Sequence, residues 1–184
     1  MPGLLENKYR SMQKTFTMNL INKKKIFFFN LIFILVIFIL DRISKIYVIS
    51  QYKKNFKNIL FESKFLNIHL IWNDGIAFGL LSFNEKNFYN ILSLVIILVS
   101  LIILYLAYKE KGLKRYAMLT IFAGSLGNLF DRLFYRSVPD FIDFHIDNFH
   151  WFIFNVADIF ITLGVITMIM TEFLSNNNKK KINE

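Results

Sequence analysis

The sequence predicts a membrane protein with an all-α core of four transmembrane helices, a small antiparallel β-sheet outside the membrane, and a short loop or helix on that same side. Of its 184 residues, 55% are hydrophobic and 22 are Phe, and the mean hydropathy is +0.43. A chain this apolar is typical of a membrane-embedded domain. Long uncharged segments between short basic blocks predict the spans, and one segment with a two-residue period predicts the sheet.

The N-terminal part is expected to contain a tail and the first span. Residues 1–22 are polar and aperiodic, so we expect a disordered extension ahead of a single membrane-embedded domain at residues 23–175. The first span is expected at about residues 26–48. Its apolar run stops at Asp41, short of the roughly 20 residues that cross a bilayer, so Asp41 should lie within or at the edge of the membrane. No small-residue cleavage site follows, which argues against a signal peptide.

The segment at about residues 56–84 is expected to form the surface sheet. Apolar side chains recur there at every second position, at Leu66, Ile68, Leu70 and Trp72. This alternation is typical of strands. Asn73, Asp74 and Gly75 provide turn residues. Because aromatic side chains favour the level of the lipid headgroups, we expect Trp72 and Phe78 there.

Three further spans are predicted, at about residues 88–108, 116–133 and 154–174. The first of these is uncharged throughout, and the second ends in an acidic and a basic residue, Asp131 and Arg132. A run of uncharged residues of this length crosses a bilayer as a helix. Residues 176–184 are then expected to be a cytoplasmic tail.

The distribution of basic residues predicts the orientation. Basic blocks at residues 23–25, 109–115 and 179–181 fall on one side of a four-span topology. Basic loops favour the cytoplasm, so both termini are expected inside, with the sheet and the 133–153 loop outside. The loop at residues 53–57 is also basic, but the opposite orientation would place three basic blocks outside to accommodate this one.

The residue types exclude several classes of function. Cys is absent, which excludes disulfides, thiol nucleophiles and Cys-bound metals. The net charge of +9 comes from blocks beside the spans, without an Arg-rich face or an RNA-binding motif, so we expect no nucleic-acid partner. His69, His145 and His150 lack a zinc-ligand spacing, and no HExxH or GxSxG motif occurs. We expect no cofactor and no metal, and His145 and His150 are expected to be interfacial loop residues.

Acidic residues gather at one depth of the predicted membrane domain. Five of the 13 acidic residues fall within residues 124–158, namely Asp131, Asp140, Asp143, Asp147 and Asp158. The rise of a helix places Asp41 and Asp131 about 24 Å beyond the preceding basic block, near the outer face of a hydrocarbon core about 30 Å thick. Asp158 reaches a similar depth. An ionisable group there is costly, which makes each acid a candidate for function.

Helical spacing pairs these acids with amides. Asn128 and Arg132 share a helix face beside Asp131, and Asn155 shares one with Asp158. Two facing carboxyl groups at low dielectric retain one proton between them, while the ionised one can deprotonate a water. This chemistry hydrolyses peptides, and depth alone favours Asp131 with Asp158. In the same helices, Gly124 and Gly127 permit close helix packing.

Other interpretations remain open at this point. One alternative is that each acid simply marks a helix end, with Asp41 paired to Arg42 or Lys45 and Asp131 paired to Arg132. A proton or ion carrier is a second alternative, but the inner half of every predicted span lacks the ionisable residues that a relay needs. A purely structural bundle leaves the cluster of Asn and Asp unexplained.

Five short stretches, in order, resemble the conserved boxes of the bacterial lipoprotein signal peptidase family, also called type II signal peptidase. They are Asp41-Arg42-Ile43-Ser44-Lys45, Asn73-Asp74-Gly75-Ile76-Ala77-Phe78-Gly79, residues 124–132, Val138-Pro139-Asp140-Phe141 and Phe154-Asn155-Val156-Ala157-Asp158. Together with the four-span layout, the resemblance covers nearly all of the chain beyond residue 22.

The resemblance implies a multi-pass aspartic endopeptidase of the bacterial inner membrane. Such an enzyme removes the signal peptide of diacylglyceryl-modified prolipoproteins by cleaving before the lipidated cysteine. The active site would lie on the periplasmic face. The implied partners are lipid-modified prolipoproteins and membrane lipid, and we expect a monomer.

By position within the boxes, the resemblance selects Asp140 and Asp158 as the catalytic pair. Asp131 then becomes a supporting residue tied to Arg132, and Asp143 is the competitor of Asp140. Because Pro139 stops a helix, a short re-entrant loop could return Asp140 to the membrane surface. The supporting residues implied by the resemblance are Asp41, Lys45, Asn73, Gly75, Asn128, Asp131, Arg132, Asn155 and Ala157.

Two supporting residues would contact the substrate, and two positions depart from the family pattern. Arg132 would contact a substrate carbonyl, and Asn73 would hold the extended peptide by hydrogen bonds. Ile76 stands where the family has a small Ala, which narrows the groove. Arg136 stands where a Gly precedes the Val-Xaa-Asp-Phe box, which alters the turn that places Asp140.

Overall fold

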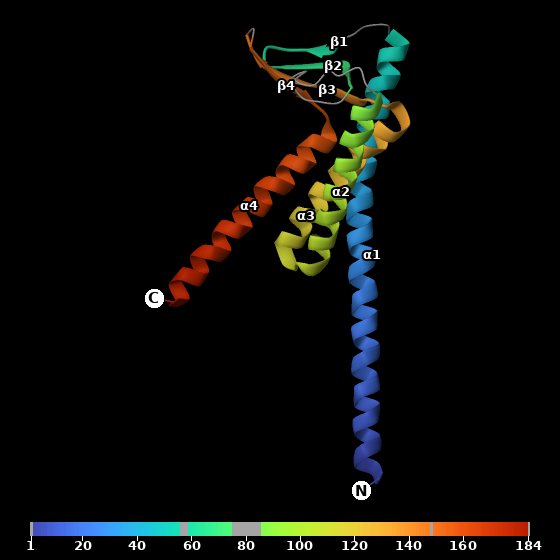
Figure 1. The fold of residues 1–184 in the computed structure, drawn as a ribbon, viewed down its shortest axis with the longest axis vertical. Coiled ribbons are helices and arrows are strands. Elements are labelled where there is room, and N and C mark those ends of the chain that lie inside the picture. Colours follow the sequence, from blue (N-terminus) through green and yellow to red (C-terminus); the bar gives the residue numbers. More distant parts are fainter. Residues whose placement is uncertain (1, 56–58, 75–85, 148, 184) are drawn as a thin grey trace. The chain divides into compact units, whose positions relative to one another are not determined.

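The computed structural model describes residues 2–55, 59–74, 86–147 and 149–183 (Figure 1). The elements are α1 (Pro2–Asn55), β1 (Ile59–Glu62), β2 (Leu66–Asn73), α2 (Lys86–Lys109), α3 (Gly112–Tyr135), β3 (Val138–Ile146), β4 (Phe149–Phe154) and α4 (Val156–Asn183). The chain divides into two compact units, Met1–Phe33 and Ile34–Glu184. The first contains the N-terminal part of α1, and the second contains all the other elements.

Three of the described helices contain segments long and apolar enough to cross a membrane, Leu20–Lys54, Tyr89–Lys109 and Val156–Ser175. They correspond to the predicted first, second and fourth spans. Helix α3, the predicted third span, is not among them because charged residues lie near both of its ends, including Arg115 and Asp131. A mostly helical membrane protein with a small antiparallel sheet is therefore confirmed.

Helix α1 differs from its prediction at both ends. The backbone is helical from Pro2, where we expected a disordered extension over residues 1–22, and it continues to Asn55 rather than to about residue 48. Beyond Pro2 and Gly3 the segment contains no helix breaker, and it is rich in Leu, Met, Gln and Lys, which have high helix propensity. Lys53 and Lys54 in the last turn also favour this end, because they complement the negative end of the helix dipole.

The sheet is larger than predicted. Its four antiparallel strands lie in the order β1-β2-β3-β4, and β1 and β2 come from the segment expected to form strands (Figure 1). The hairpin of β3 and β4 was wrongly expected to be a short loop or helix, and His145 and His150 lie on its strands. Its residues are mainly aromatic and β-branched, and they pair along the open edge of β2.

Asp140 consequently lies on a central strand and not on a re-entrant loop. It pairs with Ile71 of β2, and the preceding Pro139 pairs with Trp72. Pro is tolerated near the first residue of a strand, where the missing N–H costs least. The strand gives Asp140 a backbone that is hydrogen-bonded to its neighbours.

The turn between α3 and β3 retains the geometry that a Gly would favour. Arg136 caps α3 in the left-handed conformation, with φ 58° and ψ 18°. A side chain in this region costs roughly 1–2 kcal/mol relative to Gly. Arg136, which departs from the family pattern, therefore keeps the left-handed conformation of the turn at an energetic cost. Strand β3 starts two residues later, at Val138.

Close packing brings α3 against the first turn of α4 and against α1. A Cβ atom on Gly124 would lie 2.6 Å from the carbonyl oxygen of Ala157, and one on Gly127 would lie 2.6 Å from Oδ2 of Asp41. Larger side chains at these two positions would separate the helices. The predicted use of both glycines in helix packing agrees with these distances.

Candidate active site

A buried cluster of polar side chains lies where α1, α3, β3 and the start of α4 meet. The side chains of Asp41, Asp131 and Asn155 are fully buried, and Lys45 is 1% exposed. Burial of so many ionisable groups is costly unless each is paired and hydrogen-bonded. The hydrogen bonds and ion pairs of each buried group therefore determine which carboxyl groups are available for chemistry.

Asp140 accepts hydrogen bonds on both carboxylate oxygens. The Nδ2 atom of Asn73 lies 2.9 Å from Oδ2, and the Nδ2 atom of Asn155 lies 2.6 Å from Oδ1. Burial and the negative charge of Asp158 raise the pKa of Asp140 to about 6, although the hydrogen bonds from Asn73 and Asn155 lower it. Asp140 therefore holds its proton up to about pH 6.

Asp158 and Asn155 form a capping box at the start of α4. The backbone N–H of Asn155 donates to Oδ2 of Asp158 at 3.1 Å, and the N–H of Asp158 donates to Oδ1 of Asn155 at 3.2 Å. The side-chain amide of Asn155 also donates to Asp140. Asn155 thus connects the two acids, because its side-chain amide holds the carboxyl group of Asp140 and its backbone N–H holds that of Asp158.

Asp41 supplies a second cap to α4 from a different helix. Its Oδ1 atom accepts the backbone N–H of Ala157 at 3.0 Å, one of the first-turn donors that have no partner within the helix. A carboxylate at this end also complements the positive end of the helix dipole. Asp41 and Ala157 therefore position the turn that carries Asp158.

Lys45 connects this cap to the amides of the site. Its Nζ atom lies 2.7 Å from Oδ2 of Asp131, 2.8 Å from Oδ1 of Asn128 and 3.0 Å from Oδ1 of Asp41. These three contacts match the three donors of an ammonium group. Because Lys45 occupies the oxygen of Asn128, the amide nitrogen of Asn128 points to Asp158 and donates to its Oδ1 at 2.8 Å.

Arg42 binds both Asp41 and Asp131, whereas the sequence alone indicated a contact with Asp41 only. It donates to Oδ2 of Asp41 at 2.6 Å and to Oδ2 of Asp131 at 2.7 Å, and it also contacts Oδ1 of Asp131. Its guanidinium lies over the ring of Phe130, 4.8 Å from the centroid. The expected tie between Asp131 and Arg132 was wrong, because Asp131 pairs with Arg42 and Lys45.

Arg132 is left with donors that no described residue uses. Its Nε and Nη1 atoms are buried without a hydrogen-bond partner among the described residues, and its guanidinium lies 5.8 Å from the ring centroid of Tyr89. Arg132 lines a cavity of about 250 Å³ together with Asn128, Ser100 and Ser125. An arginine in this setting can bind a carbonyl oxygen or a carboxylate.

The structure brings most of the predicted site residues together. The network described above joins Asp41, Lys45, Asn73, Asn128, Asp131, Asp140, Asn155, Ala157 and Asp158. Gly75, Ile76 and Phe78 lie outside the described residues. Asp143 is three positions beyond Asp140 on β3, and side chains with this spacing point to opposite faces of a sheet.

Comparisons with known proteins match this chain over most of its length. The family model described as signal peptidase II matches residues 33–174. A lipoprotein signal peptidase of Pelagibacter ubique is 46% identical over 91% of this chain and 99% of its own. One from Anaplasma phagocytophilum is 41% identical over 74% of this chain and 86% of its own. A solved bacterial membrane enzyme superposes with a TM-score of 0.67 at 31% identity, covering 82% of this chain and 90% of that one.

Proposed function

The chain belongs to the signal peptidase II family, and from this membership we propose that Asp140 and Asp158 are its catalytic pair. The resemblance predicted from the five boxes is thereby confirmed. Members of this family are membrane-bound aspartic peptidases that remove the signal peptides of prolipoproteins, and this is the function of the chain. The positions of the two carboxyl groups explain how it can perform the reaction.

The observation that carries the proposed pair is Asn155, whose side-chain amide donates to Asp140 and whose backbone N–H donates to Asp158. One acid of the pair holds a proton, and the raised pKa of Asp140 makes it the favoured holder. The other acid takes a proton from a water as the water oxygen attacks the scissile carbonyl carbon. The held proton then passes to the substrate as the C–N bond breaks, and it belongs to the pair as a whole.

Two further residues are placed to bind the extended peptide. The Nε and Nη1 atoms of Arg132, which have no partner among the described residues, can donate hydrogen bonds to a substrate carbonyl oxygen in the cavity beside Asn128. Asn73 ends β2 next to Asp140, where it can contact the peptide while it orients the acid. We propose that the substrate is a diacylglyceryl-modified prolipoprotein, cleaved before its lipidated cysteine.

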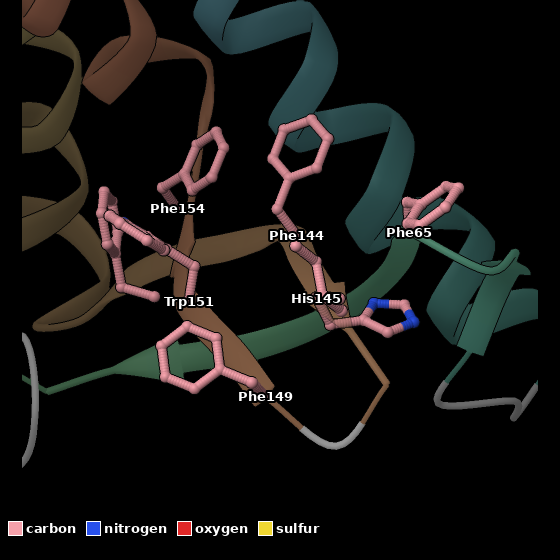
Figure 2. Close-up of a pocket in the computed structure, with 8 residues that line it drawn as sticks. Phe65, Phe144, His145, Phe149, Trp151 and Phe154 are labelled. Carbon is pink, nitrogen blue, oxygen red and sulfur yellow. The ribbon is translucent and has the colours of Figure 1, made fainter.

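An aromatic cavity supports placing the sheet at the membrane surface. The cavity has a volume of about 480 Å³ and is lined by Phe65, Phe144, His145, Ile146, Phe149, Trp151, Phe152 and Phe154 (Figure 2). Trp151 is 64% exposed and Phe149 63%, which is unusual for a water-facing sheet. Aromatic side chains favour the headgroup region, so we place the sheet and the catalytic pair at the periplasmic face of the inner membrane.

The proposed topology has four spans, with α3 as the third and both termini in the cytoplasm. Helix α3 begins near the basic residues Lys114 and Arg115, and the buried partners of Asp131 stabilise its polar end. The described residues of a single chain are sufficient to hydrogen-bond both carboxyl groups of the proposed pair, and we propose that the protein acts as a monomer.

The substrate proposal is tested with two forms of one precursor. Purified protein in detergent is incubated with a diacylglyceryl-modified prolipoprotein and with the same precursor lacking the lipid, and the products are analysed by mass spectrometry. We expect cleavage of the lipidated form alone, immediately before the modified cysteine. Equal cleavage of both forms would contradict the proposed substrate class.

The pH dependence of cleavage tests the shared proton. Burial raises the pKa of Asp140 to about 6, so the proton is held below this pH and lost above it. We therefore expect kcat/KM to fall with an apparent pKa near 6, about tenfold per pH unit on the alkaline side. The measurement is initial cleavage rate at low substrate concentration, at pH values from about 5 to about 8. A constant kcat/KM across this range would contradict the assignment.

A further inference from the structure

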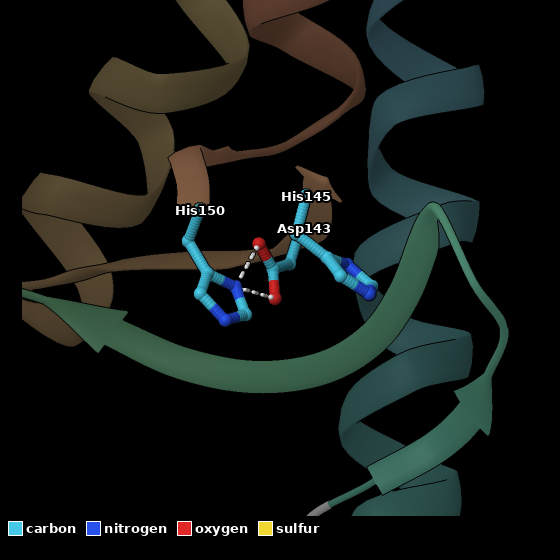
Figure 3. Close-up of side chains that lie close together, drawn as sticks. All are labelled: Asp143, His145 and His150. Carbon is cyan, nitrogen blue, oxygen red and sulfur yellow. Dashed lines mark hydrogen bonds and ion pairs between the residues drawn. The ribbon is translucent and has the colours of Figure 1, made fainter. Parts of the chain in front are cut away.

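A second polar cluster lies on the sheet around Asp143, apart from the catalytic pair (Figure 3). The chain contains three His, and all three lie near the carboxyl group of Asp143. Nδ1 of His150 lies 2.9 Å and 3.0 Å from the two carboxylate oxygens, and Nδ1 of His69 lies 3.9 Å from Oδ2. Ligand atoms of Asp143, His145 and His150 all lie within 4.8 Å of one another.

The strand pairing explains this convergence. Asp143 and His145 are two residues apart on β3 and therefore share a face of the sheet. His150 of β4 lies directly opposite His145, so it joins the same face. The pairing shifts register between Asp143 and His145, and such a bulge changes the direction of nearby side chains. His69 of β2 is two residues from Asn67, the partner of Asp143.

The cluster combines a buried carboxyl group, a ring nitrogen without a hydrogen-bond partner among the described residues, and a solvent-exposed imidazole. The side chain of Asp143 is 1% exposed and that of His150 is 53% exposed. Nδ1 of His145 is buried without a hydrogen-bond partner among the described residues. The rings of His145 and His150 are stacked, with centroids 5.1 Å apart. The proposed catalytic pair uses none of these groups.

We propose that Asp143, His145 and His150 form a binding site for Zn²⁺, with His69 as the neighbouring fourth ligand. Two imidazoles and a carboxylate are ligands that Zn²⁺ prefers, whereas Mg²⁺ and Ca²⁺ require oxygen ligands. Around a tetrahedral Zn²⁺ the ligand atoms are about 3.4 Å apart, so small side-chain rotations bring these three atoms into place. The solvent-exposed edge at His150 provides the entry path.

The sequence led us to expect no metal because the linear spacing of the histidines fits no helical or loop zinc motif. The cluster depends instead on a hairpin, which the sequence did not predict. Zn²⁺ at this position would connect β3 to β4, and β3 carries Asp140 on its other face. The metal would hold the sheet together and take no part in the cleavage step, so this inference is independent of the catalytic assignment.

The test measures Zn²⁺ binding by the full chain in detergent, purified without a histidine tag. We expect one Zn²⁺ per chain by elemental analysis after desalting, and the visible absorption of tetrahedral Co²⁺ when Co²⁺ replaces it. His150→Gln and the double variant His145→Gln/His150→Gln should weaken the affinity at least about tenfold, since even the loss of outer partners of a metal site costs about 10–100-fold. Excess Mg²⁺ should not compete.

Asp147→Asn is the matched control, because Asp147 is an exposed acid at the turn of the same hairpin. Asp147 has φ 52°, a conformation that Asn tolerates, so this variant should bind Zn²⁺ as the unchanged protein does. Circular dichroism of each variant excludes unfolding as the cause of lost binding. Absence of stoichiometric Zn²⁺, or equal affinity in the His150→Gln and Asp147→Asn proteins, would overturn the proposal.

Discussion

Replacing either Asp140 or Asp158 by Asn should abolish cleavage of a lipidated precursor while the protein still folds and inserts into the membrane. In the proposed mechanism each carboxyl group is needed, because one holds the transferred proton and the other activates the water. A positioned acid or base contributes about 10²–10⁴-fold to a rate, and loss of either should cost at least this factor. Asn preserves the shape of the side chain but keeps only one acceptor oxygen, so the loss is assigned to the proton only for a variant that is shown to be folded.

Cleavage by purified Asp140→Asn and Asp158→Asn proteins is measured under single-turnover conditions, with Asp147→Asn as the control acid. Thermal midpoints in detergent show whether each variant is folded. Retained activity in a clean preparation of Asp158→Asn would refute the proposed mechanism. The alternative mechanism is that of a proton or ion carrier, in which Asp41, Asp131 and Asp158 relay charge across the bilayer.

Asp131 is a poor candidate for the catalytic pair, although its depth first favoured it. Its two oxygens are bound by Arg42 and Lys45, both of which carry a positive charge. Both oxygens of Asp131 are engaged by these contacts, so neither is presented to a water. Asp140, by contrast, is bound by two neutral amides, and its pKa is raised. This difference in partners favours Asp140 over Asp131 for the proposed pair.

The sequence predicted those parts of the fold and site that depend on local spacing. Uncharged runs predicted three of the helices that can cross a membrane. The spacing of Asn155 and Asp158 placed them on one helix face, and the structure has them in a capping box. The small residues Gly124 and Gly127 predicted close helix contacts, which the structure contains.

The sequence could not predict contacts between distant segments. Arg42 and Asp131 are 89 positions apart, whereas Arg132 stands beside Asp131 and was therefore the visible partner. Adjacent side chains on a helix do not face each other, so this proximity was misleading. The β3–β4 hairpin was missed because its aromatic residues follow no clear two-residue period. With the hairpin missed, the face that gathers the three histidines could not be predicted.

Lys45→Met should destabilise the protein more than most single substitutions. The change leaves Asp41 and Asp131 buried with Arg42 as the one remaining cation that contacts them among the described residues. Removing one partner from a buried ion pair costs about 3–5 kcal/mol, because it leaves a charge uncompensated at low dielectric. We therefore expect a large decrease of the thermal midpoint in detergent. Lys53→Met is the control, since Lys53 lies exposed in the last turn of the same helix.

A double variant distinguishes the charge effect from loss of packing. Lys45→Met combined with Asp131→Asn removes one cation and one anion together, so the stability lost should be smaller than the sum of the two single losses. Activity should remain low in both proteins, because Asn128 loses the partner that directs its amide to Asp158. If Lys45→Met were no less stable than Lys53→Met, the buried network would not be what holds α1, α3 and α4 together at the site. The catalytic acids would then depend mainly on the sheet and the Asn155 cap for their positions.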